Sequence, residues 1–219
     1  MNSIWVIGDV HGEYDKLMKL LSQIPKNDTI CFVGDLVDRG KNSAKVVDFV
    51  ISNDYDCVLG NHELLMIEGC EDFTNKQLWK SNGGNKTIKS YYSFEYRFKK
   101  NTLKRDLKWM RDLPYFKYYE FEGYKPLVVS HSYIHGIWRG QEYSYSSDDI
   151  DTILWTHMYD ENSFNPTKEE QNNIFNIFGH TVLKEPKITQ NYANIDTGAC
   201  FKNGKLSAVN YPSLEVISV

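Results

Sequence analysis

Residues 3–40 read SIWVIGDVHGEYDKLMKLLSQIPKNDTICFVGDLVDRG, and their pattern indicates the class of fold. The apolar run 4–7 predicts a buried strand, and the segment 14–21 carries apolar side chains at every third or fourth position, which is the spacing of a helix with one buried face. A second apolar run, 29–33, predicts the next strand. A strand, a helix and a strand in this order indicate parallel strands joined by a crossover helix, so we expect an α/β fold.

The same alternation continues over the first third of the chain. We expect a helix at 43–51 with Ser43 as its N-cap, a short strand at 57–59, and another helix from His62. A chain of 219 residues can bury one substantial core. The prediction is therefore a single domain over residues 1–219.

Between residues 72 and 112 aromatic side chains alternate with lysines and arginines. We predict a mostly helical insertion, ended by Pro114, that lies over the edge of the sheet. Basic residues with interleaved aromatics also occur where proteins bind acidic peptides or nucleic acid. The interpretation we favour is a helical cap with buried rings and solvated charges.

The second half of the chain is expected to add a second set of strands. Runs 115–121 and 125–129 flank Glu122-Gly123 and predict a β-hairpin. The polar segment 133–173 predicts loop and short helix. Four further strand-like runs follow, at 174–178, 193–195, 206–210 and 214–218.

Composition limits the function classes. The net charge of −4 gives no overall attraction to nucleic acid or to an anionic membrane, and no apolar run approaches the ~18 to 20 residues that cross a bilayer. The four cysteines are scattered, with no CxxC pair, which favours reduced thiols. We predict a soluble, cytoplasmic protein with neither a membrane nor a nucleic-acid partner.

Polar clusters follow three of the predicted strands. They read GDVHG at 8–12, GDLVDRG at 34–40 and GNHE at 60–63, and Asp9, Asp35 and Asn61 are evenly spaced, 26 positions apart. Because parallel strands deliver their carboxyl ends to one edge of a sheet, the three clusters should meet there.

Two later histidines, His131 and His180, also follow apolar runs. The set expected to converge is Asp9, His11, Asp35, Asn61, His131 and His180. These oxygen and imidazole donors suit Mn²⁺, Fe²⁺ or Zn²⁺ better than Ca²⁺. Six ligands suit two ions that share a carboxylate, with Asp35 as the natural bridge and a metal-bound hydroxide as the direct attacking group in phosphoester hydrolysis.

The motifs GDxHG, GDxVDRG and GNHE, followed by SHS at 130–132 and GHT at 179–181, resemble the phosphoprotein phosphatase branch of the metallophosphoesterases. With Asn82-Gly83-Gly84 and the IDTGA stretch at 195–199, the chain looks most similar to the bacteriophage lambda-type phosphatases. The resemblance implies a β-sandwich of mixed sheets flanked by helices.

The resemblance also implies a ligand set for each of two divalent ions, with Mn²⁺ favoured and Fe²⁺ or Zn²⁺ as alternatives. Asp9, His11 and Asp35 match the ligands of the first ion. The residues that match the ligands of the second ion are Asp35, Asn61, His131 and His180.

His62 matches the general acid that protonates the leaving oxygen, and Asp38 matches the residue that orients it. Arg39 matches the arginine that holds the substrate phosphate through paired N–H donors, with Asn61 and His131 as further phosphate-binding residues.

The chain departs from the family pattern at two places. Leu59 stands where relatives commonly carry arginine before GNHE, and residues 155–158 read WTHM where relatives supply a second phosphate-binding arginine. His157 or Arg139 are candidates to substitute for it. These departures leave the substrate range open.

The predicted function is a metal-dependent phosphomonoesterase that resembles serine/threonine protein phosphatases and acts on phosphorylated proteins or peptides and on small phosphoesters. The alternative enzyme is a dinucleoside tetraphosphate hydrolase or nucleotide phosphatase. A third hypothesis is a catalytically silent module that binds phosphorylated partners, against which the complete ligand set and the presence of His62 and Asp38 argue.

Overall fold

The computed structural model describes residues 3–93, 101–134, 136–158 and 173–219. Their strands form two five-stranded sheets. The first contains β1 Ile4–Ile7, β2 Thr29–Phe32, β3 Asp56–Cys57, β9 Ser207–Tyr211 and β10 Val216–Ser218. The second contains β4 Phe116–Tyr119, β5 Leu127–Ser130, β6 Phe175–Phe178, β7 Lys187–Ile188 and β8 Tyr192–Asn194.

Both sheets are mixed. The first has the order β10-β9-β1-β2-β3, in which β1, β2 and β3 are parallel and β9 and β10 run antiparallel to their neighbours. The second has the order β4-β5-β6-β8-β7, with β5, β6 and β8 parallel and an antiparallel strand on each edge. Within each sheet, the three parallel strands therefore have their carboxyl ends at the same edge.

The two sheets pack face to face. Alternate side chains of β1 point in opposite directions, so the strand contributes to two apolar layers. Ile4 and Val6 lie in one apolar layer with Val129 and Ile177 of the second sheet, whereas Trp5 lies in another layer with the helices. Both faces of β1 are buried, as expected for a parallel strand covered on each side. The predicted β-sandwich of mixed sheets with flanking helices is confirmed.

The first helices follow the sequence prediction closely. They are α1 Tyr14–Leu21, α2 Ser43–Ser52 and α3 Asn61–Glu71. The prediction that Ser43 caps α2 is wrong, because the N-cap is Asn42 and Ser43 is the first helical residue. The Ser43 hydroxyl instead accepts a hydrogen bond from the Asp38 N–H at 3.2 Å, so this side chain supports the loop before the helix.

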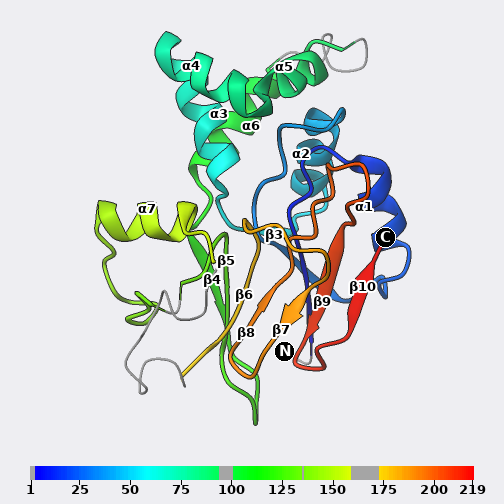
Figure 1. The fold of residues 1–219 in the computed structure, drawn as a ribbon, viewed down its shortest axis with the longest axis vertical. Coiled ribbons are helices and arrows are strands. Elements are labelled where there is room, and N and C mark those ends of the chain that lie inside the picture. Colours follow the sequence, from blue (N-terminus) through cyan, green and yellow to red (C-terminus); the bar gives the residue numbers. More distant parts are fainter. Residues whose placement is uncertain (1–2, 94–100, 135, 159–172) are drawn as a thin grey trace.

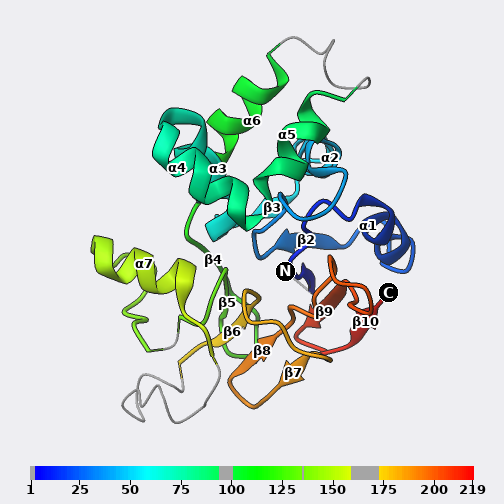
Figure 2. The same cartoon turned by 45° about the horizontal axis from the view of Figure 1, so that its top comes forward.

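Helices make up the described part of the predicted insertion 72–112; residues 94–100 lie outside the described residues. The elements are α4 Phe73–Trp79, the π-helical turn η1 Lys80–Gly84, α5 Asn85–Tyr91 and α6 Thr102–Arg111, which we call the cap. The cap packs mainly on α2 and α3, beyond the ends of the strands (Figures 1 and 2). It therefore reaches the sheet through these two helices and does not lie directly over its edge.

The predicted β-hairpin is confirmed, since β4 and β5 pair antiparallel around a turn at Glu122-Gly123. The segment 133–173 contains α7 Ser147–Trp155, with Ser146 as its N-cap, while residue 135 and residues 159–172 lie outside the described part. Sequence analysis missed β7, because two residues show no periodicity.

The four cysteines, Cys31, Cys57, Cys70 and Cys200, are free thiols, as expected. Within the described ranges, no helix combines the length and the apolar character needed to cross a lipid bilayer.

Candidate metal centre

Five residues of the first two motifs and of the later histidine segment have backbones in the left-handed region, which non-glycine residues rarely adopt. They are His11 (φ 46°), Asp35 (φ 50°), Asp38 (φ 71°), Arg39 (φ 62°) and His180 (φ 67°). Each such conformation costs on the order of 1 kcal/mol and persists only where the surroundings impose it. The chain turns sharply after β1, β2 and β6, which directs these side chains into one region.

Glu63 ties two of the motif loops together. Its carboxylate accepts hydrogen bonds from the backbone N–H groups of Asp35 (2.7 Å), Leu36 (2.8 Å) and Gly60 (3.1 Å). Burial, followed by the charge of Asp35, raises the pKa of Glu63 to about 7. A Cβ at position 60 would overlap Asp35 Oδ1, so only glycine allows the two loops to approach this closely.

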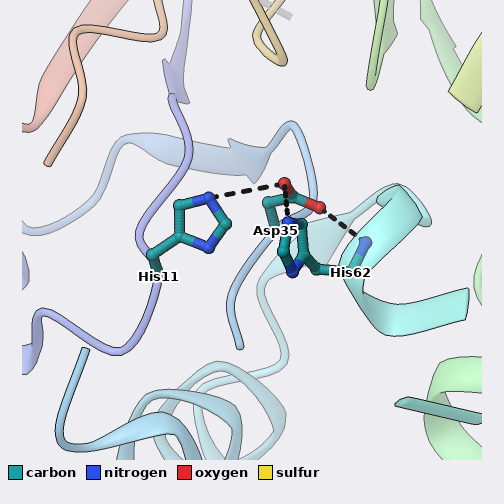
Figure 3. A group of neighbouring side chains, drawn as sticks. All are labelled: His11, Asp35 and His62. Atoms are coloured by element: carbon teal, nitrogen blue, oxygen red, sulfur yellow. Dashed lines mark hydrogen bonds and ion pairs between the residues drawn. The ribbon is translucent and has the colours of Figure 1, made fainter. Parts of the chain in front are cut away.

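His11, Asp35 and His62 form a buried group, shown in Figure 3. Asp35 Oδ2 lies 3.5 Å from His11 Nε2 and 4.0 Å from His62 Nε2. The His62 backbone N–H donates to Asp35 Oδ1 at 3.0 Å. Asp35 therefore occupies the middle of the site, as its central place in the sequence series suggested.

On the other side of Asp35 lies a second group, formed with Asp9 and His131. His131 Nε2 lies 3.5 Å from Asp35 Oδ1, 2.8 Å from Asn61 Oδ1 and 3.1 Å from His180 Nδ1. The structure thus brings the six predicted ligand residues to one place, with Asp35 between the two groups.

Asp9 and His180 are joined directly, although 171 positions separate them in sequence. The His180 backbone N–H donates to both carboxylate oxygens of Asp9 at 3.3 Å. A Cβ at position 179 would overlap Asp9 Oδ1. Glycine at this position therefore lets β6 of the second sheet deliver His180 against the first sheet.

The histidine rings are oriented as neutral ligands. His11 Nδ1 donates to the Val37 carbonyl at 2.8 Å, and His131 Nδ1 donates to the Val33 carbonyl at 2.9 Å. Burial lowers the pKa of His11 to about 3 and also lowers that of His131. With Nδ1 protonated, each neutral ring directs the lone pair of Nε2 into the site, as in metal centres whose ligand histidines are fixed by carbonyl groups.

The donor atoms fit a cation. With Nδ1 of His131 donating to Val33, the lone pair of His131 Nε2 faces Asn61 Oδ1 at 2.8 Å, an arrangement of two acceptors that a cation between them would stabilise. Within the described ranges, His180 Nε2 is buried with no hydrogen-bond partner. Burial, and then the charges of Asp196 and Asp35, raise the pKa of Asp9 well above its ordinary value, although Arg39 opposes the shift, so a further cation would stabilise the carboxylates.

Asp196 belongs to this carboxylate cluster, although sequence analysis gave it no role. It follows β8, is 2% exposed, and its Oδ1 accepts from the Gly198 N–H at 2.9 Å. Burial raises its pKa to about 6, and the charge of Asp35 adds to the effect. The available sequence signal was an aspartate directly after the apolar run 193–195.

His62 is held from the other side by Asp38. His62 Nδ1 donates to Asp38 Oδ2 at 2.7 Å. Burial alone would lower the pKa of His62, but Asp35 and Asp38 outweigh it and the net shift is upward. Asp38 also accepts from Trp79 Nε1 at 2.9 Å and from the Thr87 hydroxyl at 2.6 Å, so the cap supplies two donors that sequence analysis missed.

Arg39 spans the two histidines of the first group. Its Nη1 lies 2.8 Å from His11 Nε2, and its Nη2 lies 2.9 Å from His62 Nε2. The Arg39 backbone N–H donates to the Gly83 carbonyl of η1. The cap therefore contacts the arginine as well as Asp38.

The sequence profile of the calcineurin-like phosphoesterases matches residues 3–205. This chain belongs to that family. The family uses a dinuclear metal centre, and the two buried groups around Asp35 provide donor atoms of the kind such a centre needs. The chain is thus a phosphoesterase of the hydrolase class.

Relatives within the calcineurin-like phosphoesterases have different names. The chain is 29% identical to the asymmetrical bis(5'-nucleosyl)-tetraphosphatase PrpE of Anoxybacillus flavithermus, over 98% of this chain and 92% of that protein. It is 28% identical to serine/threonine-protein phosphatase 2 of Escherichia coli K12, over 93% and 90%. The solved metallophosphoesterase of Sphaerobacter thermophilus has the same fold, with a TM-score of 0.58, 16% identity, and coverage of 99% of this chain and 86% of that one.

The positions at which this calcineurin-like phosphoesterase departs from the pattern lie in different surroundings. The His157 ring stacks on His180, with centroids 4.4 Å apart and planes 29° from parallel. Arg139 lies beside Trp138 and Tyr145, and its backbone N–H donates to the Tyr145 hydroxyl at 3.1 Å. Leu59 is buried in the apolar layer of the helices. Of the two candidates for a second phosphate contact, the structure brings His157 to the centre.

Proposed function

We propose that this calcineurin-like phosphoesterase hydrolyses phosphomonoesters, with phosphoserine and phosphothreonine in proteins or peptides as the substrate class and small aryl phosphates also accepted. The observation that carries the proposal is the arrangement around Asp35. This carboxylate belongs to two groups of donor atoms, the His62–Asp38 pair lies beside it, and Arg39 contacts His11 and His62.

The donor groups support two ion positions that share Asp35. By the resemblance to the family, Asp9, His11 and Asp35 would hold one ion, and Asp35, Asn61, His131 and His180 would hold the other. The most compact groups of donor atoms are divided differently, because they join His11 to His62 and Asp9 to His131, each with Asp35. This mixture of carboxylate, amide and imidazole donors favours Mn²⁺, with Fe²⁺ or Zn²⁺ as alternatives. Such ions would supply Lewis acidity to the phosphoryl oxygens and lower the pKa of an attacking water.

His62 is suited to protonate the leaving oxygen. Asp38 accepts from Nδ1 and so leaves Nε2 facing the site, and the two carboxylates near His62 favour its protonated form. A protonated Nε2 cannot accept a hydrogen bond from Arg39. The acid form of His62 and the bond between Arg39 and His62 therefore exclude each other, which releases one arm of Arg39 for the substrate.

The guanidinium of Arg39 is placed to bind one phosphoryl group through its two N–H arms. Both arms point at the centre, toward His11 and His62, and the charge of Arg39 acts on Asp9, His11 and His131. Where relatives carry a second phosphate-binding arginine, this chain has Trp155 and His157, whose rings lie against His180. The charge of Arg39, together with the rings of Trp155 and His157 beside His180, favours a monoester over a polyphosphate.

A second candidate function is hydrolysis of dinucleoside tetraphosphates. It is supported by the similarity to the PrpE tetraphosphatase, which extends over 98% of this chain. The same ion positions would serve, because only the group attached to the attacked phosphorus differs.

The experiment compares initial rates on phosphoserine and phosphothreonine peptides, p-nitrophenyl phosphate and diadenosine tetraphosphate, each with Mn²⁺ added to metal-free protein. The proposal expects a larger kcat/KM for the monoesters. A preference of tenfold or more for the dinucleotide would replace it with the second candidate. Absence of turnover on every substrate, together with tight binding of one phosphopeptide, would instead favour a module that binds phosphorylated partners without catalysis.

A further inference from the structure

The cap contains a cavity of about 540 Å³ that is separate from the metal centre. It lies between α3, α4, α5 and α6, with walls from each of these helices. The apolar part of the lining is Met66, Trp79, Ile88, Tyr91, Leu103 and Leu107. Close packing in protein interiors leaves few voids larger than a water molecule, whereas small-molecule sites commonly measure about 300 to 1,000 Å³.

Three lysines, Lys76, Lys80 and Lys89, also line this cavity. The ion pairs that the described residues form in the cap and on α3 involve other cations, namely Arg105, Lys108 and Arg111. Across the described ranges, no ion pair includes any of the three cavity lysines. Three positive charges beside an apolar wall complement a ligand that has both an apolar body and a negative charge.

We propose that the cap cavity binds a small amphipathic organic anion, with an aromatic or acyl body and one carboxylate, sulfonate or phosphate group. The body would contact Trp79, Ile88 and Leu107, and the anionic group would lie among the lysines. This site is distinct from the position at which Arg39 would hold the phosphoryl group of a substrate, so the proposal does not depend on which phosphoester is hydrolysed.

Trp79 connects the cavity with the centre. Its ring forms part of the cavity wall, and its indole N–H donates to Asp38, the carboxylate that holds His62. A Cβ added at Gly69 or Gly84 would come within 3.0 Å of the Trp79 ring. The ring is thus held tightly from two sides, and it is 2% exposed, so it contributes to the wall of the cavity from a fixed position.

Binding is tested with two matched fluorescent probes, the anion 8-anilinonaphthalene-1-sulfonate and its uncharged counterpart N-phenyl-1-naphthylamine. Titration of the intact, metal-loaded protein should give saturable binding of the anion. The triple change Lys76→Glu, Lys80→Glu and Lys89→Glu should raise the Kd of the anionic probe by about tenfold or more. The Kd of the uncharged probe should stay within about twofold. The control Lys104→Glu, on α6 but outside the lining, should affect neither.

The place of binding is tested through two thiols. Cys70 lines the cavity. Cys200 lies near Arg39 at the centre, where burial raises the pKa of its thiol and the guanidinium opposes that shift. Saturating anilinonaphthalene sulfonate should slow alkylation of Cys70 by iodoacetamide, measured by peptide mass spectrometry, and leave Cys200 unchanged.

A second variant keeps the test decisive if the triple lysine change prevents folding. Leu107→Trp adds volume inside the cavity and should abolish the protection of Cys70, while the charge of the protein is unchanged. Anion binding that survives both variants, or unchanged Cys70 alkylation in the presence of the probe, would overturn the proposal.

Discussion

The two sheets contribute to the centre in different ways. The first sheet and α3 supply Asp9, His11, Asp35 and Asn61 within three glycine-rich motifs, whereas the second sheet supplies His131, His180 and Asp196 one at a time, each after a separate strand. Glu63, Val37 and Arg39 hold the first-sheet side through hydrogen bonds. On the second-sheet side His131 donates to Val33 and the backbone of His180 donates to Asp9, but within the described ranges His180 Nε2 has no partner. The two sides thus differ mainly at the His180 ring, whose Nε2 is left without a partner among the described residues, while the rings of His11 and His131 are held by hydrogen bonds.

The largest effect is expected where the two sides meet, at Asp35. Asp35→Asn removes the carboxylate that both proposed ion positions share, so bound metal should fall from two ions per chain to one or none. We expect kcat/KM for p-nitrophenyl phosphate to fall at least about 10⁴-fold, roughly 5.5 kcal/mol of transition-state stabilisation. Elemental analysis beside steady-state kinetics checks this, and full metal content with near-normal activity would exclude the shared-ligand role.

On the first-sheet side, His62 should affect chemistry and leave metal content unchanged. His62→Asn removes the proton donor, so turnover of phenyl phosphate should slow by about 10²- to 10⁴-fold. The loss should be smaller for p-nitrophenyl phosphate, whose leaving group needs less protonation. If metal content fell in parallel with activity, His62 would be acting as a ligand and the proposed acid role would be wrong.

A smaller effect is expected one contact further out, at Trp79. Trp79→Phe keeps an aromatic ring but removes the N–H that donates to Asp38, and outer contacts of this kind are worth about 10- to 100-fold. We expect the turnover of phenyl phosphate to fall by an amount near the lower end of this range and that of p-nitrophenyl phosphate to change little. Trp109→Phe, elsewhere in the cap, is the matched control. Equal losses on both substrates would indicate general damage to the cap.

The smallest effect concerns the second-sheet side in metal-free protein. Burial raises the pKa of Asp196 to about 6. Its contribution to the free energy of unfolding is therefore fully present below pH 3.8, the pKa of this carboxyl in the unfolded chain, and is lost as the pH rises through 6. The stability of Asp196→Asn minus that of the unmodified chain should therefore increase by about 1 kcal/mol between pH 5 and pH 8.

Thermal unfolding in EDTA at the two pH values measures this difference, with the exposed Asp151→Asn as control. Added Mn²⁺ should narrow the gap, because a cation offsets the carboxylate charge. A gap that does not vary with pH would mean that Asp196 is not part of the carboxylate cluster.

Motifs with regular spacing made much of the fold and the position of the centre predictable. The run 4–7, the helix 14–21 and the glycine-led loops encode strand, helix and strand end through local patterns, and parallel strands must bring such loops together. Trp79 and Thr87 could not be predicted in this way, because they reach Asp38 from 41 and 49 positions away and only the packing of the cap determines their direction. Ser43 was misassigned because tertiary contacts with the Asp38 loop outweighed its preference for an N-cap.

Anomalous diffraction from crystals of the Mn²⁺-loaded protein tests the central claim most directly, namely that Asp35 lies between two ions. We expect two manganese peaks, one in contact with Asp9 and His11, the other in contact with Asn61, His131 and His180, and both in contact with Asp35. A single peak, or peaks bound by other side chains, would contradict it.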